Sequence, residues 1–163
     1  MACKVLQIPI CVAIVCCGVA FIFQLVAVAG TGWLVISVGD NSEEVGLFRL
    51  CVNGVCTEYQ MNDLEDWLKA CQAFSILGLL TITGSLVLGI LHFVLEDTAK
   101  VSVAGIASCA ASVVFLIIEL AVFGAETSSL RKVYNFGYGF ILSVIACILS
   151  FVAAVLFAVG SRM

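Results

Sequence analysis

Four long apolar runs constrain this chain more than any other feature of its sequence. They cover residues 5–29, 67–95, 101–124 and 136–159, and each is long enough for a helix to cross the hydrocarbon core of a bilayer, which takes about 20 residues. An apolar fraction of 63% and a charged fraction of 11% lie far outside the range of soluble domains. We therefore expect one membrane domain of four transmembrane helices, with both ends of the chain on the same side.

The long polar segment between the first two runs, residues 30–66, contains a hairpin signal. Asn53-Gly54 separates two short apolar runs, and this dipeptide favours a two-residue turn in which both residues have positive φ. A turn at this point places Cys51 opposite Cys56 in a non-hydrogen-bonded pair, whose side chains approach closely enough for a disulfide. A bond closing so short a loop adds only about 2 kcal/mol, so we expect it mainly to hold the register of a small sheet.

The same segment predicts three antiparallel strands and the start of a helix. Residues 33–38, 45–52 and 55–59 are rich in strand-forming side chains, and residues 39–42 have the composition of a turn. Asn62 followed by Glu65 has the spacing of a capping box. That spacing predicts a helix that begins at Asn62 and continues into the second apolar run.

Charge alone does not orient these helices in the membrane. Three positive side chains flank one side and four flank the other: Lys4, Lys100 and Arg162 against Arg49, Lys69, Arg131 and Lys132. The positive-inside rule is therefore undecided. A disulfide persists only in an oxidising compartment. We therefore place residues 30–66 and 125–135 outside the cell, and both termini and residues 96–100 in the cytoplasm, as in a multi-pass protein of the plasma membrane.

The fourth apolar run carries small residues at a strict spacing of four: Ala146, Ser150, Ala154 and Ala158. Helices in lipid associate where small side chains let their backbones approach. The stripe therefore predicts a packing face. It leaves open whether that face lies inside the bundle or against another molecule.

Three polar side chains lie within the predicted spans, about one turn or slightly more from one end: Gln24, Gln72 and Glu119. A carboxylate in this position is costly unless it is paired or protonated. One interpretation is a polar cluster that joins the first three spans, and the other is a proton or ion relay. We favour the cluster, because no second acidic residue or histidine continues a path through the membrane.

Several classes of function are disfavoured by what the sequence lacks. The net charge of −4 argues against nucleic acid as a partner. No phosphate-binding glycine loop and no metal-ligand spacing occurs, and one histidine leaves little basis for histidine triads or metal sites. We therefore expect a protein that is not an enzyme and that uses no cofactor or metal.

One set of residues resembles a known family signature: Trp33, Gly46, Leu47, Phe48, Cys51 and Cys56. It is similar to the W…GLW…C…C pattern of claudins, epithelial membrane proteins, peripheral myelin protein and calcium-channel γ subunits. Residues 66–77 resemble the start of the second span in the myelin and epithelial proteins, and residues 134–137 resemble the start of the fourth span in claudins.

This resemblance implies a left-handed four-helix bundle that carries an extracellular antiparallel sheet with one disulfide. Two departures from the family pattern lie within the signature itself. Phe48 stands where a tryptophan is usual, and the two cysteines lie closer together than is usual, which makes the hairpin short.

Three functions remain open at this stage. The first is a contact protein of cell junctions, binding the same or related tetraspan proteins in its own or the opposing membrane. The second is an accessory subunit of a larger channel or receptor, docked through the fourth span. The third, with the least support, is a transporter that uses Glu119.

Acidic residues in the first outer loop bear on the first of these functions: Asp40, Glu43, Glu44 and Glu58. If the loop lined a path between cells, they would favour cations, because fixed negative charge raises the local cation concentration. A solvated loop face is the simpler explanation of these acids.

Overall fold

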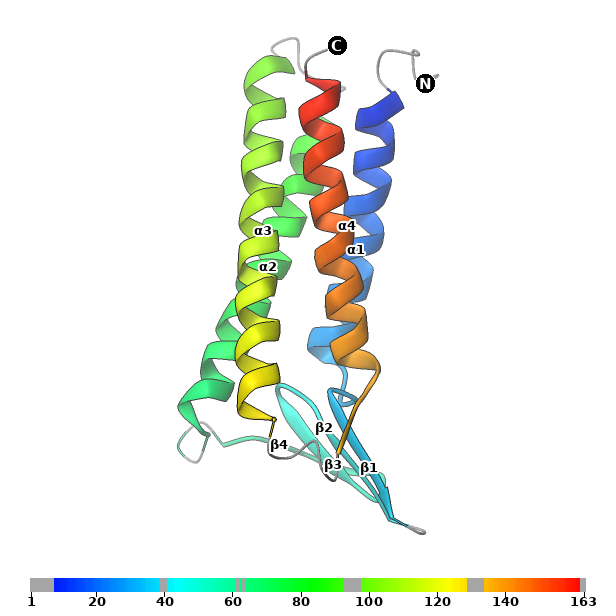
Figure 1. Ribbon diagram of the computed structural model, residues 1–163, viewed down its shortest axis with the longest axis vertical. Helices are drawn as coiled ribbons and strands as arrows, with labels where there is room; N and C mark the ends of the chain where they lie inside the picture. The colour runs from blue at the N-terminus through cyan, green and yellow to red at the C-terminus, as the bar shows by residue number, and fades with distance from the viewer. Residues whose placement is uncertain are drawn as a thin grey trace.

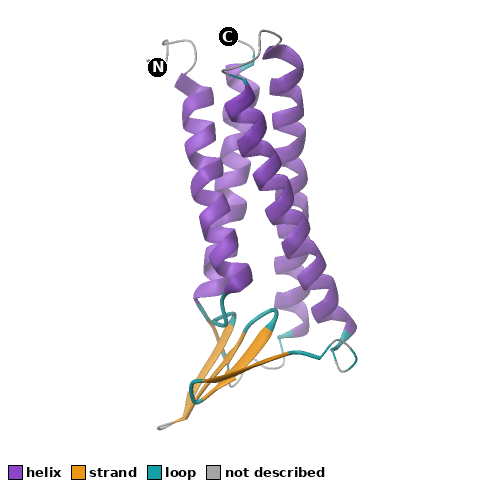
Figure 2. Cartoon of the chain, turned by 180° about the vertical axis from the view of Figure 1, so that it is seen from behind, coloured by secondary structure: helices purple, strands orange, loops and turns teal. Residues whose placement is uncertain are grey.

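Four helices stand side by side and a small sheet closes one end of the bundle (Figures 1 and 2). The computed structural model describes residues 8–38, 41–60, 62, 64–92, 98–128 and 134–161. The helices are α1 (Ile8–Ala29), α2 (Asp66–Leu91), α3 (Thr98–Glu126) and α4 (Tyr138–Gly160). Each is long and apolar enough to cross a membrane, which agrees with the four spans expected from the sequence. Helix α1 begins and α4 ends at the end of the bundle opposite the sheet (Figure 1).

The prediction that the second helix begins at Asn62 is wrong. Asn62 is an exposed turn residue, and α2 begins at Asp66, with Glu65 in the N-cap position. Glu65 makes no side-chain capping bond. Its carboxylate instead accepts a hydrogen bond from the indole N–H of Trp67, so the acid that should complete the capping box is used elsewhere.

The buried positions of α1, α3 and α4 alternate at spacings of three and four residues. On α4 they are Gly139, Ser143, Ala146, Ser150, Ala153 and Phe157. This alternation averages 3.5 residues and keeps one stripe facing the neighbours of a left-handed bundle. A strict spacing of four drifts away from that stripe. Ala146 and Ser150 are therefore buried in the bundle, whereas Ala154 and Ala158 are only partly buried.

Three apolar layers follow one another along the bundle. The layer farthest from the sheet includes Ile10, Cys17, Cys109 and Phe157, and the middle one contains Ala20, Ile82, Leu116 and Ala146. The third layer is shared with the sheet: Ala27, Trp33, Leu34, Leu47, Leu64, Leu68, Cys71 and Phe123. The loop that precedes α2 is thus part of the same core as the helices.

The sheet has five antiparallel strands in the order β4-β3-β2-β1-β5. The strands are β1 (Leu34–Val38), β2 (Asn41–Val45), β3 (Arg49–Val52), β4 (Val55–Glu58) and β5 (Asn135–Phe136). Four of them come from the segment between α1 and α2. The fifth comes from the segment before α4, where Phe136 pairs with Leu34 of β1. The sheet therefore joins the two loops at this end of the bundle.

Three details of the sheet differ from the sequence predictions. The strand predicted over residues 45–52 is two strands, because the chain bends at Gly46, whose N–H donates to the carbonyl of Arg49 at 2.9 Å. Asn41 and Ser42 belong to β2 rather than to a turn, and residues 39 and 40 lie outside the described part. Phe136 lies in a strand rather than in the fourth helix.

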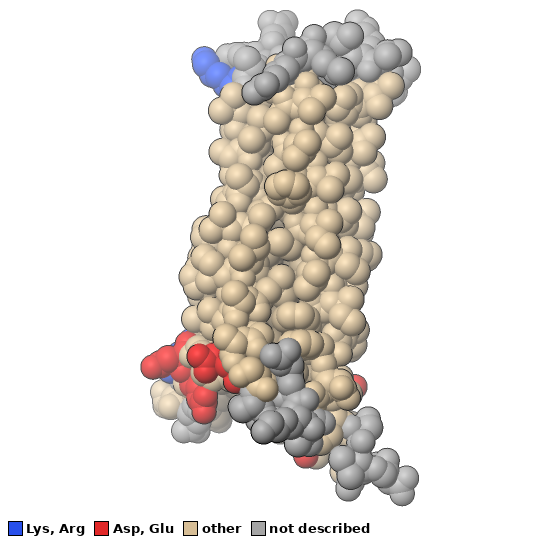
Figure 3. All heavy atoms as spheres, viewed as in Figure 1, with Lys and Arg blue, Asp and Glu red and all other residues tan. Residues whose placement is uncertain are grey.

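Charged side chains gather at the two ends of the molecule. On the face seen in Figure 3, Asp and Glu lie at the sheet end of the bundle, most of them at its lower left, and a broad band without charged side chains separates them from a positive side chain at the other end. Many large apolar side chains of the helices are exposed, among them Val15, Leu80, Val103 and Phe151. An apolar belt of this kind is the surface that a helix bundle presents to lipid.

Candidate functional site: the sheet and its junction with the bundle

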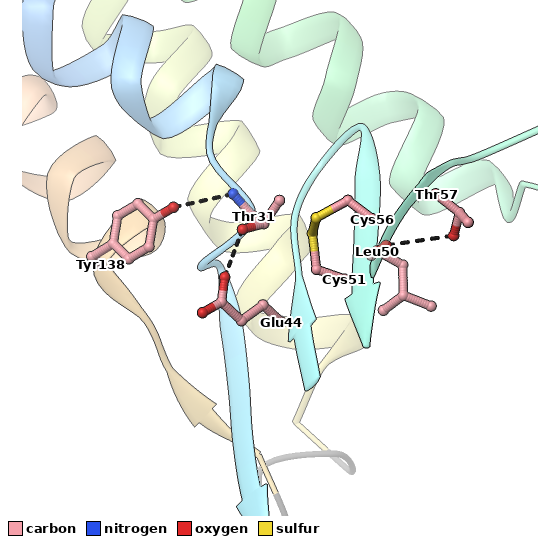
Figure 4. The surroundings of a disulfide bond; sticks show 7 residues. All are labelled: Thr31, Glu44, Leu50, Cys51, Cys56, Thr57 and Tyr138. Carbon is pink, nitrogen blue, oxygen red and sulfur yellow. Dashed lines mark hydrogen bonds between the residues drawn. A yellow bond between two sulfur atoms is a disulfide. The ribbon is translucent and has the colours of Figure 1, made fainter. Parts of the chain in front are cut away.

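The hairpin has the turn and the disulfide that its sequence predicts. Asn53 has φ 50° and Gly54 has φ 81°, the left-handed conformation that this two-residue turn requires. Cys51 pairs directly with Cys56 across β3 and β4, their Cα atoms are 4.0 Å apart, and their sulfurs form a disulfide (Figure 4). Cys51 is buried and Cys56 is exposed, so water reaches this bond from the open side of the sheet.

Removing this disulfide should weaken the sheet more than the bundle. Replacing Cys51 and Cys56 together by Ser should lower the free energy of unfolding by about 2 kcal/mol and reduce display at the cell surface. Denaturant unfolding in detergent and surface biotinylation measure the two effects. Cys16→Ser, at a partly buried free thiol of α1, is the matched control. Unchanged stability and display in the double variant would mean that the hairpin keeps its register without the bond.

Trp33, the first residue of the family motif, anchors the sheet to the bundle. Its side chain is fully buried, and its indole N–H donates to the carbonyl of Ala27 in α1 at 2.7 Å. Its ring packs edge-on against Phe123 of α3 and Phe140 of α4, at centroid distances of 4.8 and 6.1 Å. One side chain therefore contacts three of the four helices.

The Gly-Leu-Phe triplet supplies the second anchor. Leu47 is fully buried in the core shared with the helices, and Gln72 of α2 donates its side-chain N–H to the carbonyl of Leu47 at 2.6 Å. Phe48 packs against the same core and is partly buried. The sequence predicts Gln72 in a polar cluster with Gln24 and Glu119, but its amide donates to this backbone carbonyl instead.

Two glycines permit the close approach of backbones at the junction. A Cβ atom on Gly46 would lie 2.6 Å from the carbonyl oxygen of Gly30 and 2.8 Å from the Cα of Thr31. A Cβ atom on Gly137 would lie 2.3 Å from the carbonyl oxygen of Gly32. The segment that follows α1 therefore lies in direct backbone contact with the bend after β2 on one side and with the segment leading to α4 on the other.

The loop acids do not gather on one face of the sheet. Glu43 and Glu44 are neighbours on β2, so their side chains point to opposite faces. The carboxylate of Glu44 accepts a hydrogen bond from the Thr31 hydroxyl at 2.6 Å (Figure 4), and that of Glu43 accepts one from the Tyr134 hydroxyl at 2.8 Å. Glu58 is exposed on β4. Asp40 lies outside the described residues.

Glu43 also affects the pKa of Tyr134, its hydrogen-bond partner. The hydrogen bond to the Glu43 carboxylate, followed by burial, raises the pKa of Tyr134 above its ordinary value. Removing the phenol proton would break the bond and place two negative charges side by side. The bond therefore stabilises the sheet below the pKa of an unfolded tyrosine, about 10, and this contribution is lost as the pH rises through the folded pKa.

We expect Glu43→Gln to lower the pKa of Tyr134 toward the ordinary tyrosine value. Titration of the phenolate absorbance in detergent-solubilised protein measures the change. Glu58→Gln removes an exposed acid from the same sheet and should leave the titration curve unchanged. Equal curves for wild type and Glu43→Gln would show that this hydrogen bond does not form in solution.

Two small cavities are found among the described residues at this end of the molecule. A hollow of about 180 Å³ lies on the disulfide side of the sheet, lined by Thr31, Ser42, Glu44, Cys51, Gly54 and Cys56. Another of about 230 Å³ lies between the sheet and α2. Both fall below the range of roughly 300–1,000 Å³ typical of small-molecule sites. Within the described ranges, no group of three or more His, Cys, Asp or Glu side chains is placed to hold a metal ion.

A polar layer lies between the middle apolar layer and the layer shared with the sheet. Each helix contributes one fully buried side chain: Gln24, Ser75, Glu119 and Ser143. The amide N–H₂ of Gln24 donates to Ser75 at 3.2 Å and to the Glu119 carboxyl at 3.3 Å. The hydroxyl of Ser143 donates to the same carboxyl oxygen at 3.4 Å. The structure thus brings Gln24 and Glu119 together and adds two serines that the sequence analysis missed.

Comparison with known proteins agrees with this architecture. Residues 6–157 match the profile of the PMP-22/EMP/MP20/Claudin family. The chain is 28% identical over 156 residues to the lens fiber membrane intrinsic proteins of Rattus norvegicus and Mus musculus, which covers 91% of this chain and 88% of each relative. The protein of the same name from Bos taurus is also 28% identical over 156 residues. With its four membrane-spanning helices, its anchoring tryptophan and its disulfide-bonded sheet, this chain belongs to the PMP-22/EMP/MP20/Claudin family.

Proposed function

We propose that this protein is a non-enzymatic contact protein of cell junctions, which organises them through its sheet. The observation that carries the proposal is the free edge of that sheet. All four residues of β4 are exposed, and Val55 at the hairpin tip is 70% exposed beside Val52 at 39%. An edge strand leaves one row of backbone N–H and C=O groups unpaired, and exposed apolar side chains beside it favour association.

The way the sheet is mounted supports the same proposal. Trp33, Leu47 and the backbone contacts at Gly46 and Gly137 fix the sheet to all four helices. A rigid platform of this kind orients its edge relative to the membrane before any partner arrives. Pre-organisation reduces the entropy lost on binding. It therefore favours association between identical or related molecules even where each of them buries little surface.

The proposed orientation places the sheet outside the cell and both termini in the cytoplasm of a plasma-membrane protein. Its main support is the disulfide between Cys51 and Cys56. Cys56 is exposed to solvent, so cytosolic thiols would reach the bond and reduce it, whereas the cell exterior preserves it. The partners proposed are the lipid bilayer and the same or related tetraspan proteins, in the same membrane and across the contact.

Mixed cultures of labelled cells test this function. Cells that lack junctional strands are transfected with the tagged protein and mixed with untransfected cells. We expect enrichment where two expressing cells touch, and none where an expressing cell touches a plain one. Val55→Asp, which places a charge on the exposed tip, should reduce the enrichment at equal surface level. Uniform staining of wild-type cells would contradict the proposal.

The accessory-subunit alternative gains little from the structure. Two of the four small residues that would form a docking face, Ala146 and Ser150, are buried inside the bundle. Uniform staining together with a larger membrane protein that co-purifies in fixed ratio would favour the alternative.

A further inference from the structure

The polar layer of the bundle contains two hydrogen-bond acceptors without a donor. The side-chain carbonyl oxygen Oε1 of Gln24 and the carboxyl oxygen Oε1 of Glu119 are buried, and neither has a partner. Both side chains are fully shielded from solvent. A buried polar atom without a partner costs free energy. Because these two atoms belong to side chains that are hydrogen-bonded to each other, they indicate that the network lacks a donor at this point.

None of the amide or hydroxyl donors of the layer reaches either of these two oxygens. The amide N–H₂ of Gln24 has two hydrogens, directed at Ser75 and at Oε2 of Glu119, and the Ser143 hydroxyl is directed at the same Oε2. The two oxygens without a partner cannot hydrogen-bond to each other, because neither carries a hydrogen atom. The ionisable member of the pair is Glu119, and a proton on its Oε1 turns that oxygen into a donor.

The geometry then closes into a cyclic pair of an amide and a carboxylic acid. One arm is present in the structure, where Gln24 donates to Oε2 of Glu119 at 3.3 Å. In the second arm, the acid O–H would donate to Oε1 of Gln24, the other oxygen that lacks a partner. Both orphan oxygens gain a partner through this single proton.

The charges around Glu119 favour the same state. The groups that approach it from the other helices carry no charge: Gln24 on α1, Ser75 and Cys71 on α2, and Ser143 and Cys147 on α4. In the described part of the chain, the one ion pair joins Lys69 and Asp66 at the surface. A carboxylate without a counter-charge inside a membrane-spanning bundle is strongly disfavoured, whereas a neutral acid bonded to an amide is not.

We propose that Glu119 is a neutral carboxylic acid in the folded protein, and that its proton completes a hydrogen-bonded network that joins all four helices next to the apolar layer shared with the sheet. Phe123 lies one turn further along α3, on the same face as Glu119, and packs against Trp33. This hydrogen-bonded network therefore fixes the register of the helices next to the aromatic cluster that supports the sheet.

Infrared spectroscopy of the purified protein in detergent tests the protonation state. At neutral pH we expect the C=O stretching band of a protonated carboxyl group in the wild type and its loss in Glu119→Gln. Gln24→Leu removes the amide that pairs with the acid and should shift the band to higher frequency. Ser108→Ala removes another interhelical hydrogen bond, to the carbonyl of Thr81, and should leave the band in place.

Thermal unfolding provides a second and independent readout. Glu119→Gln keeps a neutral group that can donate a hydrogen bond, so its Tm should stay near that of the wild type. Glu119→Ala opens the network and should lower Tm by about 5 °C. A wild type without the band, a band that survives in Glu119→Gln, or equal losses of Tm in Glu119→Gln and Glu119→Ala would each overturn the proposal.

Discussion

Replacing Trp33 by Ala should lower the free energy of unfolding by about 3–5 kcal/mol, the range for truncating a large buried aromatic side chain. Trp33 is fully buried, touches Phe123 and Phe140, and donates to the carbonyl of Ala27. Its loss leaves a cavity where the sheet meets the bundle and an unpaired carbonyl at the end of α1. Denaturant unfolding of the purified protein measures the change, and retention inside the cell should accompany it.

Two variants separate the contributions of Trp33. Trp33→Phe keeps most of the aromatic packing and removes the indole N–H, so we expect it to lose about 1–2 kcal/mol. Trp67→Ala truncates the second tryptophan of the chain, which is only partly buried, and should cost less than Trp33→Ala. Equal effects for the two Ala variants would show that Trp33 is not the anchor described above.

The second large effect is expected for Gly46→Ala, which should lower the free energy of unfolding by about 3 kcal/mol through overpacking. The added Cβ would lie within 2.8 Å of two backbone atoms, the carbonyl oxygen of Gly30 and the Cα of Thr31. Backbone atoms cannot rotate away as a side chain does. The bend between β2 and β3 must therefore move off the end of α1, which also displaces the neighbouring Leu47 from the core.

A helical glycine provides the matched control for Gly46. A Cβ on Gly18 of α1 would meet no atom within 4 Å. Gly18→Ala should therefore stabilise the protein slightly, by up to about 1 kcal/mol, because Ala is the better helix former. The two substitutions are chemically identical and are expected to have opposite signs in the same unfolding assay. If Gly46→Ala left the free energy of unfolding unchanged, the bend would be able to move without loss of stability, which would contradict this prediction.

Local signals predicted much of this fold. The four spans follow from apolar length alone, and the hairpin follows from Asn53-Gly54, whose backbone angles dictate that Cys51 faces Cys56. Such features depend on a few neighbouring residues. They need no knowledge of how the rest of the chain packs.

Features that depend on packing were missed or placed wrongly. The strand β5 has only two residues and exists because Phe136 pairs with Leu34, roughly a hundred positions earlier in the chain. Ser75 and Ser143 carry no signal of their own. Their positions on the buried stripes, three or four residues from other buried positions, are the pattern that would have placed them beside Glu119.

The same limit applies to the candidate site. Depth along the spans groups Gln24 with Glu119, and the two are hydrogen-bonded in the structure, but depth does not reveal that Gln72 donates to the carbonyl of Leu47. Likewise, the acidity of Glu43 and Glu44 was visible in the sequence. Their hydrogen bonds to Tyr134 and Thr31, on opposite faces of β2, depend on the tertiary structure.

The contact function proposed for this protein requires the sheet to lie outside the cell, and cysteine labelling on intact cells tests this most directly. Asn62 is exposed at the sheet end, and Ser161 is exposed at the opposite end of the bundle. A membrane-impermeant maleimide should label Asn62→Cys in intact cells and Ser161→Cys only after permeabilisation, above the background of the unsubstituted chain. The reverse pattern would place the sheet in the cytoplasm and contradict the proposed function.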